Sequence, residues 1–207
     1  MKGNLYLIGG GEIRNGETIE IDNTLKTVAP KGTNFVFFGT AAGDNQDYIN
    51  SIKSVFNDHF NVIAPTIEDG PEFAHAAIKD ASIIYLGGGT TELLLNLFEK
   101  WELIDSLHDA LNHGTHLVGM SAGAQALSSW YIHENGNSMD LRQGWGFLSV
   151  CVLVHANPNS IDRATKLWKI NTDLQKTPLL TIEETAMWYV YSTGMQKIGS
   201  QVDAKLA

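Results

Sequence analysis

The chain has 207 residues, of which 43% are hydrophobic and 18% are charged. This composition predicts a globular protein with a hydrophobic core and excludes a disordered chain, and the length predicts a single domain over residues 1–207. The 14 Lys and Arg residues against 23 Asp and Glu residues give a net charge of −9. We therefore expect no nucleic-acid partner, because nucleic acids require a clustered basic face.

The cysteine content and the hydropathy pattern indicate the cellular compartment of the protein. Cys151 is the only cysteine and lies in an apolar run at 147–154, which excludes an intramolecular disulfide and a cysteine-rich metal site. No segment approaches the roughly 18 apolar residues of a membrane helix, and the N-terminus lacks a signal-peptide pattern. We expect a cytoplasmic protein with no metal, no cofactor and no membrane partner, and leave the oligomeric state open, with a homodimer as one option.

Short apolar runs and segments with helical spacing alternate along the first part of the chain. Segments 46–60 and 93–101 carry apolar residues at helical spacing. Glycine or small polar residues follow each run that we expect to be a strand: Leu5–Ile8, Asn34–Phe38, Ile83–Leu86 and His116–Gly119. The alternation predicts an α/β fold of three layers, with a mostly parallel sheet and helices on both faces.

The last part of the chain has a different pattern. Two β runs, Leu179–Ile182 and Met187–Tyr191, and a turn signal at 192–194 predict an addition of antiparallel strands near the C-terminal end. In parallel sheets, ligands bind beyond the carboxyl ends of the strands. The glycines that follow the expected strands therefore indicate a ligand site at that edge.

The segment Gly119–Ala124 has the pattern G-x-S-x-G between an expected strand and an expected helix at 125–131. In this context a sharp turn lifts the hydroxyl of Ser121 above the sheet edge, and the Ala122 amide can donate to an oxyanion. Small residues also gather where a strand turns tightly into a helix for structural reasons alone. We favour a catalytic serine because of the flanking strand and helix.

A nucleophilic serine needs a base and an orienting carboxylate. Of the two histidines that follow Ser121, His155 ends a strand-like run, whereas His133 lies in a polar segment that we expect to be a solvated loop. The pair Glu183-Glu184 follows a further expected strand, and either carboxylate could reach His155. The glycine run 87–89 could supply the second oxyanion donor.

The chain order of these residues separates two folds. The order Ser, acid, His of α/β-hydrolases would need Glu134 or Asp140 as the acid, within an interval too short for another strand and helix. The order Ser121, His155, Glu183 is easier to build. It is the order of the class I glutamine amidotransferase-like fold, with serine in place of cysteine.

The chain resembles the family of serine peptidases that includes dipeptidase E and cyanophycinase. The motifs that carry the resemblance are Ile8–Glu12, Gly39–Ala42, Leu86–Thr90, Gly119–Ala124, Gly144–Leu148 before His155, and Ile182–Ala186. The resemblance implies Ser121 as nucleophile, His155 as base, and Gly88, Gly89 and Ala122 as oxyanion donors. For the acid we prefer Glu183, by similarity to cyanophycinase, over Asp140 or Glu134, which are the nearest counterparts of the dipeptidase E aspartate.

Two departures from the family pattern concern the substrate side of the site. Thr90 follows the glycines where the family has Asn or Asp, and Ala156 follows His155 in place of Phe. We expect a serine hydrolase that cleaves a peptide or isopeptide bond of a small peptide through an acyl-enzyme, with Thr90 near the substrate. An aspartyl side chain in the substrate would need a cation, for which Arg142 and Arg163 are candidates.

Features of the sequence also suggest two other classes of protein. A non-catalytic module on the same fold, binding a small ligand or regulating a partner, is the alternative that the two departures suggest. A dinucleotide-binding protein would rely on Gly9–Glu12, but the third glycine of the G-x-G-x-x-G pattern is replaced by Arg14. We therefore disfavour the second of these alternatives.

Overall fold

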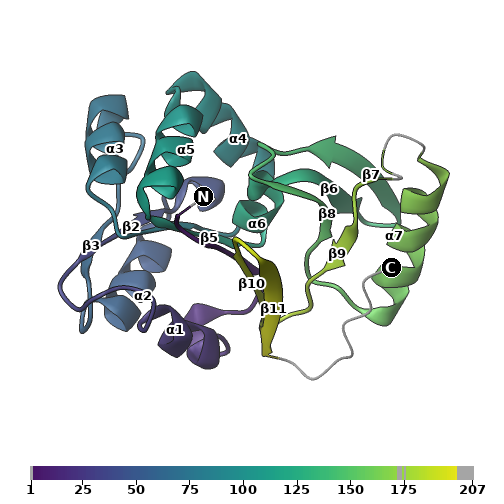
Figure 1. Cartoon of the computed structure of the whole chain (residues 1–207), viewed down its shortest axis with the longest axis horizontal. Coiled ribbons are helices and arrows are strands. Elements are labelled where there is room, and N and C mark those ends of the chain that lie inside the picture. Colours follow the sequence, from purple (N-terminus) through teal and green to yellow (C-terminus); the bar gives the residue numbers. More distant parts are fainter. Residues whose placement is uncertain (1, 172–173, 175, 200–207) are drawn as a thin grey trace.

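The computed structural model describes residues 2–171, 174 and 176–199, so both ends of the predicted domain lie outside this range. Its main sheet has seven strands in the order β11-β10-β1-β5-β4-β2-β3 (Figure 1). The five strands from β1 to β3 in this order are parallel, and β10 and β11 are antiparallel additions at one edge. The strands are β1 (Leu5–Ile8), β2 (Asn34–Phe38), β3 (Asn61–Ile63), β4 (Ile83–Leu86), β5 (His116–Met120), β10 (Ala186–Tyr191) and β11 (Gly194–Gly199).

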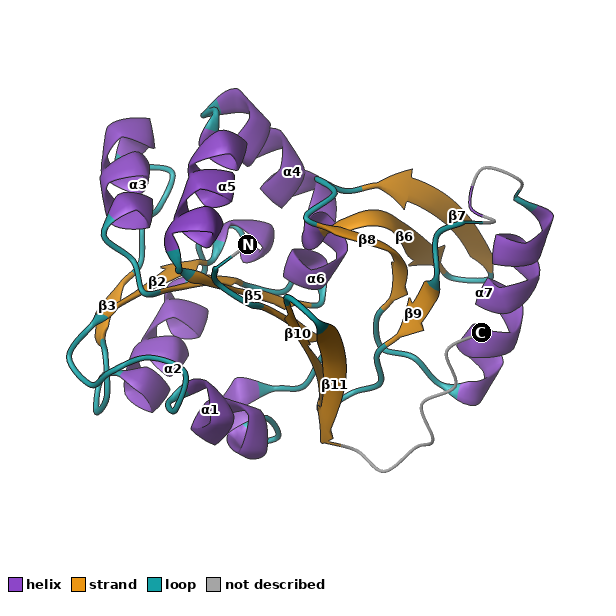
Figure 2. Ribbon diagram, in the orientation of Figure 1, coloured by secondary structure: helices purple, strands orange, loops and turns teal. Residues whose placement is uncertain are grey.

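Helices cover both faces of this sheet (Figure 2). The helices α1 and α2 lie on one face, and α3 to α6 lie on the other. The helical bounds are η1 (Ile13–Asn15), α1 (Ile19–Leu25), η2 (Thr40–Ala42), α2 (Gln46–Phe56), α3 (Gly70–Lys79), α4 (Thr91–Lys100), α5 (Leu103–His113) and α6 (Ala122–Leu127). The three-layer α/β fold with a mostly parallel sheet is therefore confirmed.

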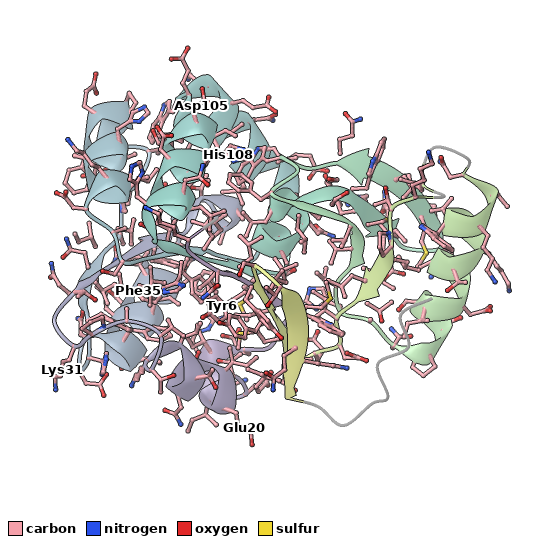
Figure 3. The ribbon with its side chains drawn as sticks, viewed as in Figure 1. Tyr6, Glu20, Lys31, Phe35, Asp105 and His108 are labelled. Atoms are coloured by element: carbon pink, nitrogen blue, oxygen red, sulfur yellow. The ribbon has the colours of Figure 1, made fainter. Side chains whose placement is uncertain are left out.

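Continuous apolar strands arise because successive side chains point to opposite faces and both faces are covered. Leu5 and Leu7 pack on the side of α3 to α6, whereas Tyr6 and Ile8 pack on the side of α1 and α2. Figure 3 shows Tyr6 and Phe35 in the interior, with Glu20, Lys31 and Asp105 at the periphery. Burial of these runs on both faces holds the carboxyl ends of β1, β4 and β5 at one edge.

A second, smaller sheet follows α6 and was not expected. Its four strands have the order β7-β6-β8-β9, and α7 packs beside it (Figure 1). The elements are β6 (Ser128–Asn135), β7 (Ser138–Gln143), β8 (Leu148–Leu153), α7 (Pro158–Ile170) and β9 (Leu179–Thr181). The antiparallel hairpin of β6 and β7 occupies the segment predicted as a helix end and a polar loop, so His133 lies in a strand.

The C-terminal prediction is correct in part. Strand β10 pairs antiparallel with β1, and β11 pairs antiparallel with β10, as expected. Strand β9 instead joins the second sheet, parallel to β8. The parallel pairing brings the carboxyl ends of β8 and β9 together, and their following loops reach the carboxyl end of β1. Within the described residues, no helix has the length and apolar character needed to cross a membrane.

Candidate active site

Ser121 lies at the sharp turn between β5 and α6. Its backbone has φ 48° and ψ −103°, a conformation that costs a non-glycine residue about 1–3 kcal/mol. The Ser121 amide donates to the Ile8 carbonyl at 2.9 Å, and the Ser121 carbonyl accepts from the Gln125 amide at 3.0 Å. These two bonds tie the strained residue to the neighbouring strand and to the first turn of the helix, so its side chain projects from the sheet edge.

Close packing around the turn explains its small residues. A Cβ atom on Gly119 would lie 2.5 Å from the Gly123 carbonyl carbon, and one on Gly123 would lie 2.2 Å from the Leu86 carbonyl oxygen. Larger residues at either position would separate α6 from β4 and β5. The predicted strand–turn–helix arrangement around Ser121 is therefore present.

His155 follows β8 and lies at the junction of the two sheets. Its amide donates to the Gly9 carbonyl at 3.2 Å, and the next amide, that of Ala156, donates to the Ile182 carbonyl at 3.0 Å. The backbone of His155 has φ 51°. This placement brings His155 Nε2 to 2.7 Å from Ser121 Oγ, across 34 residues of sequence.

The carboxylate beside the histidine belongs to Glu184. Its Oε1 lies 2.5 Å from His155 Nδ1. The expectation that Glu183 takes this place is wrong, because its carboxylate turns the other way and lies 2.7 Å from Lys197 Nζ of β11. Both side chains of the Glu183–Lys197 pair are mostly buried, with 15% and 12% of their surfaces exposed. The sequence pattern left the choice between the two glutamates open, since nothing in it distinguishes which one turns inward.

Gly10 provides the space for this contact. A Cβ atom on Gly10 would lie 2.2 Å from Glu184 Oε2 and 2.5 Å from His155 Nδ1. The Gly10 carbonyl also accepts from the Thr185 amide at 3.2 Å, which fixes the loop that carries Glu184. The sequence places the glycine run 9–11 directly after a buried strand, at the edge where a ligand site is expected, but it assigns no role in the site to Gly10.

The glycine loop after β4 approaches Ser121 from the other side. A Cβ atom on Gly88 would lie 3.5 Å from Ser121 Cβ. The Gly88 amide, predicted as an oxyanion donor, instead donates to Tyr48 Oη at 3.3 Å, so this assignment is corrected. Within the described part of the chain, no protein acceptor binds the amides of Gly89 and Ala122.

Two open cavities flank Ser121 and His155. The larger has a volume of about 480 Å³ and is lined by Gly10–Arg14, Tyr48 and Gly88–Gly89, among others. The smaller, of about 280 Å³, is lined by Thr90, Glu92, His133 and Glu134, among others. Thr90 therefore lines the same cavity as Ser121, and its contact with a substrate stays a prediction. A cavity of about 610 Å³ between α3 and α5 lies away from these residues.

The predicted arginine contacts do not reach these cavities. Arg142 pairs with Asp140, at 2.6 Å, and with Glu92, whereas Arg163 pairs with Glu134 at 3.2 Å. Neither arginine lines a cavity that contains Ser121. The two guanidinium groups are bound by the same carboxylates, Asp140 and Glu134, that were alternatives for the acid. The arginine that lines the larger cavity is Arg14, which sequence reasoning had not assigned to the site.

Burial sets the protonation of two groups that could compete with the serine. Desolvation raises the pKa of the Cys151 thiol to about 12, so this buried cysteine is not a thiolate nucleophile near neutral pH. Desolvation also raises the pKa of Tyr48 to about 12, so its hydroxyl stays protonated beside Gly88. Among the described residues, no group of three or more His, Cys, Asp or Glu side chains could hold a metal ion.

The sheet order defines a three-layer α/β protein with a mostly parallel sheet and antiparallel strands at one edge, and Ser121, His155 and Glu184 meet at the carboxyl edge of this sheet. The chain belongs to peptidase family S51, whose family model matches residues 5–198.

Individual relatives agree with this assignment. An uncharacterized peptidase of Bacillus subtilis (strain 168), YgaJ, is 24% identical, with 99% of this chain and 90% of the relative covered. Peptidase E of Shewanella sp. (strain W3-18-1) is 27% identical, with 84% and 80% covered. A crystal structure of a peptidase from an acI-B1 Actinobacterium superposes with a TM-score of 0.66 and 24% identity, over 97% of this chain and 88% of the other.

Proposed function

We propose that this peptidase-family protein is a serine peptidase that hydrolyses small peptides through an acyl-enzyme. The observation that carries the proposal is the hydrogen-bonded row of Ser121 Oγ, His155 and the Glu184 carboxylate, at 2.7 Å and 2.5 Å. A nucleophile, a base and an orienting acid within hydrogen-bond distance are what activation of a serine requires. The strained turn at Ser121 adds support, because it presents the hydroxyl toward both cavities.

The row implies one tautomer of the histidine. A carboxylate only accepts hydrogen bonds, so His155 Nδ1 carries the proton that faces Glu184. His155 Nε2 is then free to accept the proton of the Ser121 hydroxyl. As Oγ attacks the carbonyl carbon of the scissile amide, the proton moves to Nε2, and Glu184 stabilises the imidazolium that forms.

Acylation and deacylation of Ser121 then follow, and each passes through a tetrahedral intermediate. The negative oxygen accepts from the Gly89 and Ala122 amides, which support this role because no protein acceptor in the described residues binds them. Nε2 returns its proton to the leaving amine, the C–N bond breaks, and an ester to Ser121 remains. Water attacks this ester with Nε2 again as base, which releases the carboxylic acid and restores the serine.

The two cavities support a small substrate with its scissile bond above Ser121. Their volumes of about 480 and 280 Å³ suit a few amino-acid residues. Selectivity for an aspartyl side chain loses support from Arg142 and Arg163, since the guanidinium groups of both already pair with carboxylates of the protein. Arg14 is the arginine that lines the larger cavity, and there its guanidinium also binds the Glu12 carboxylate.

A labelling experiment tests the proposal. A fluorophosphonate should label the wild-type protein at Ser121 near pH 7, and Ser121→Ala should abolish the labelling while the circular dichroism spectrum stays the same. A panel of unblocked dipeptides with acidic, neutral and basic N-terminal residues then identifies the substrate. A folded wild-type protein that is neither labelled nor active on the panel would contradict the proposal and favour a non-catalytic module.

A further inference from the structure

We propose that Tyr48 is a positioning residue for the glycine loop after β4, Gly87 to Thr90. Its hydroxyl oxygen holds the Gly88 amide so that the next amide, that of Gly89, faces the reacting carbonyl. The inference rests on the proposed function, because it assigns the Gly89 amide to the oxyanion. Tyr48 lies in the first turn of α2, 40 residues before Gly88. It lines the larger cavity beside Ser121.

The hydrogen bonds of the loop show what Tyr48 adds. Three of the four successive amides from Gly87 to Thr90 have protein acceptors. Gly87 donates to the Phe38 carbonyl at 3.0 Å, Gly88 donates to Tyr48 Oη at 3.3 Å, and Thr90 donates to the Ala41 carbonyl at 2.7 Å. The amide of Gly89 is the one left for a ligand within the described residues, and Tyr48 is the one side chain among the three acceptors.

Tyr48 is itself held rigidly. Its amide donates to the Asn45 side chain at 3.0 Å, which caps α2. Its ring packs edge-on against Phe37, with centroids 5.0 Å apart and an interplanar angle of 72°. A Cβ atom on Gly87 would lie 3.1 Å from the Tyr48 ring, so the ring also contacts the start of the loop. A rigid acceptor can hold an amide in one orientation, as preorganised donors require.

The chemistry of the hydroxyl fits an acceptor role toward Gly88. Its own proton faces Met120 Sδ at 3.4 Å, so a lone pair of Oη remains for the Gly88 amide. The raised pKa keeps the group neutral, which avoids a phenolate charge next to a developing oxyanion. Gly88 lies close enough to Ser121 that a Cβ atom on it would be 3.5 Å from Ser121 Cβ, so a rotation of its peptide would displace the Gly89 donor relative to the nucleophile.

The chain offers a matched control for the test. Tyr85 Oη also donates to Met120 Sδ, at 3.3 Å, but its hydroxyl has no bond to the glycine loop. Tyr48→Phe and Tyr85→Phe each remove one hydroxyl that donates to Met120 Sδ. Only Tyr48→Phe also removes the acceptor of the Gly88 amide. The experiment measures the rate at which a fluorophosphonate labels Ser121, because the phosphoryl oxygen of this probe occupies the position of the oxyanion. The dependence of the rate on probe concentration gives the binding constant and the maximal rate separately.

We expect Tyr48→Phe to lower the maximal rate of labelling about tenfold, less than the roughly 100- to 1000-fold loss when an oxyanion donor itself is removed. The binding constant and the melting temperature should stay close to the wild type, and Tyr85→Phe should label at the wild-type rate. Equal rates for Tyr48→Phe and wild type, or equal losses in both variants, would overturn the inference. A wild-type protein that is not labelled overturns the proposed function and the inference together, before any variant is compared.

Discussion

Glu184 Oε1 lies 2.5 Å from His155 Nδ1, whereas the adjacent Glu183 pairs with Lys197 in the opposite direction. One loop thus supplies two carboxylates with separate roles. The first residue of the pair ties the loop to β11, and the second faces the histidine. Because the two carboxylates have different partners, replacing each glutamate in turn tests which one orients His155.

Replacing the two glutamates should have different effects. Glu184→Gln should lower turnover of the best dipeptide about 10⁴-fold, because the amide neither fixes the tautomer of His155 nor stabilises its imidazolium. Glu183→Gln should keep turnover within about tenfold and lower the melting temperature, since it removes the charge that Lys197 contacts in a mostly buried pair. The comparison uses steady-state rates and thermal unfolding of both variants; a larger loss of turnover in Glu183→Gln would reverse the assignment.

Gly10→Ala should disable the site without unfolding the protein. The added methyl group would overlap Glu184 Oε2 and His155 Nδ1, so the acid and the base must separate, and we expect turnover to fall by at least about 100-fold. Gly16→Ala is the matched control in the same loop, because a Cβ atom there would meet no atom within 4 Å. Its positive φ of 70° predicts a stability loss of about 1 kcal/mol and unchanged turnover. Equal turnover in the two variants would argue against the role of Gly10.

Arg14 should affect binding of substrates that carry a carboxylate. Its side chain is 54% exposed and lines the larger cavity, although Glu12 already binds it at 2.7 Å. Arg14→Gln should raise KM for an unblocked dipeptide about tenfold and should leave KM for the C-terminal amide of that dipeptide unchanged. Arg163→Gln, which changes a guanidinium outside both cavities, should alter neither value. An effect of Arg163→Gln alone would return the substrate contact to that residue.

Asp22 predicts a pH dependence of stability. Desolvation raises the pKa of this buried carboxyl to about 6, and its Oδ1 has no hydrogen-bond partner in the described residues, while Oδ2 accepts from Thr18 at 2.9 Å. Because the pKa is higher in the folded than in the unfolded state, the charged form is disfavoured on folding. The resulting penalty is absent below about pH 4, grows as the pH rises to 6, and is complete above it.

The size of this penalty follows from the pKa difference. A rise from 3.8 to about 6 corresponds to about 3 kcal/mol at most. Asp22→Asn should therefore flatten the pH dependence of the free energy of unfolding between pH 4 and 7, as measured by urea denaturation. Asp58, whose pKa Lys26 holds below its ordinary value of 3.8, stabilises the fold increasingly as the pH rises toward 4, so Asp58→Asn should alter the pH dependence only below about pH 4. An unchanged pH dependence in Asp22→Asn would contradict the assignment.

Much of the main sheet could be predicted because its strands are buried on both faces. Leu5–Ile8 and Ile83–Leu86 are apolar without interruption, and the structure has strands over the same residues. The hairpin of β6 and β7 could not be predicted in this way, since its strands mix polar, buried and half-buried residues without a regular alternation. Partial burial weakens the hydrophobic periodicity on which the prediction depends.

The residues of the candidate site also differ in how far the sequence predicts their roles. The Ser121 turn and the place of His155 after a strand could be predicted from the sequence, because local glycines and strand ends are encoded by neighbouring residues. Tertiary contacts set which of Glu183 and Glu184 faces His155, that Tyr48 Oη accepts from the Gly88 amide, and that Arg142 and Arg163 pair with carboxylates. Those choices depend on contacts between segments 29 to 50 residues apart in the chain. Spacing along the sequence does not specify such contacts, because they are set by how elements that are distant in the chain pack together.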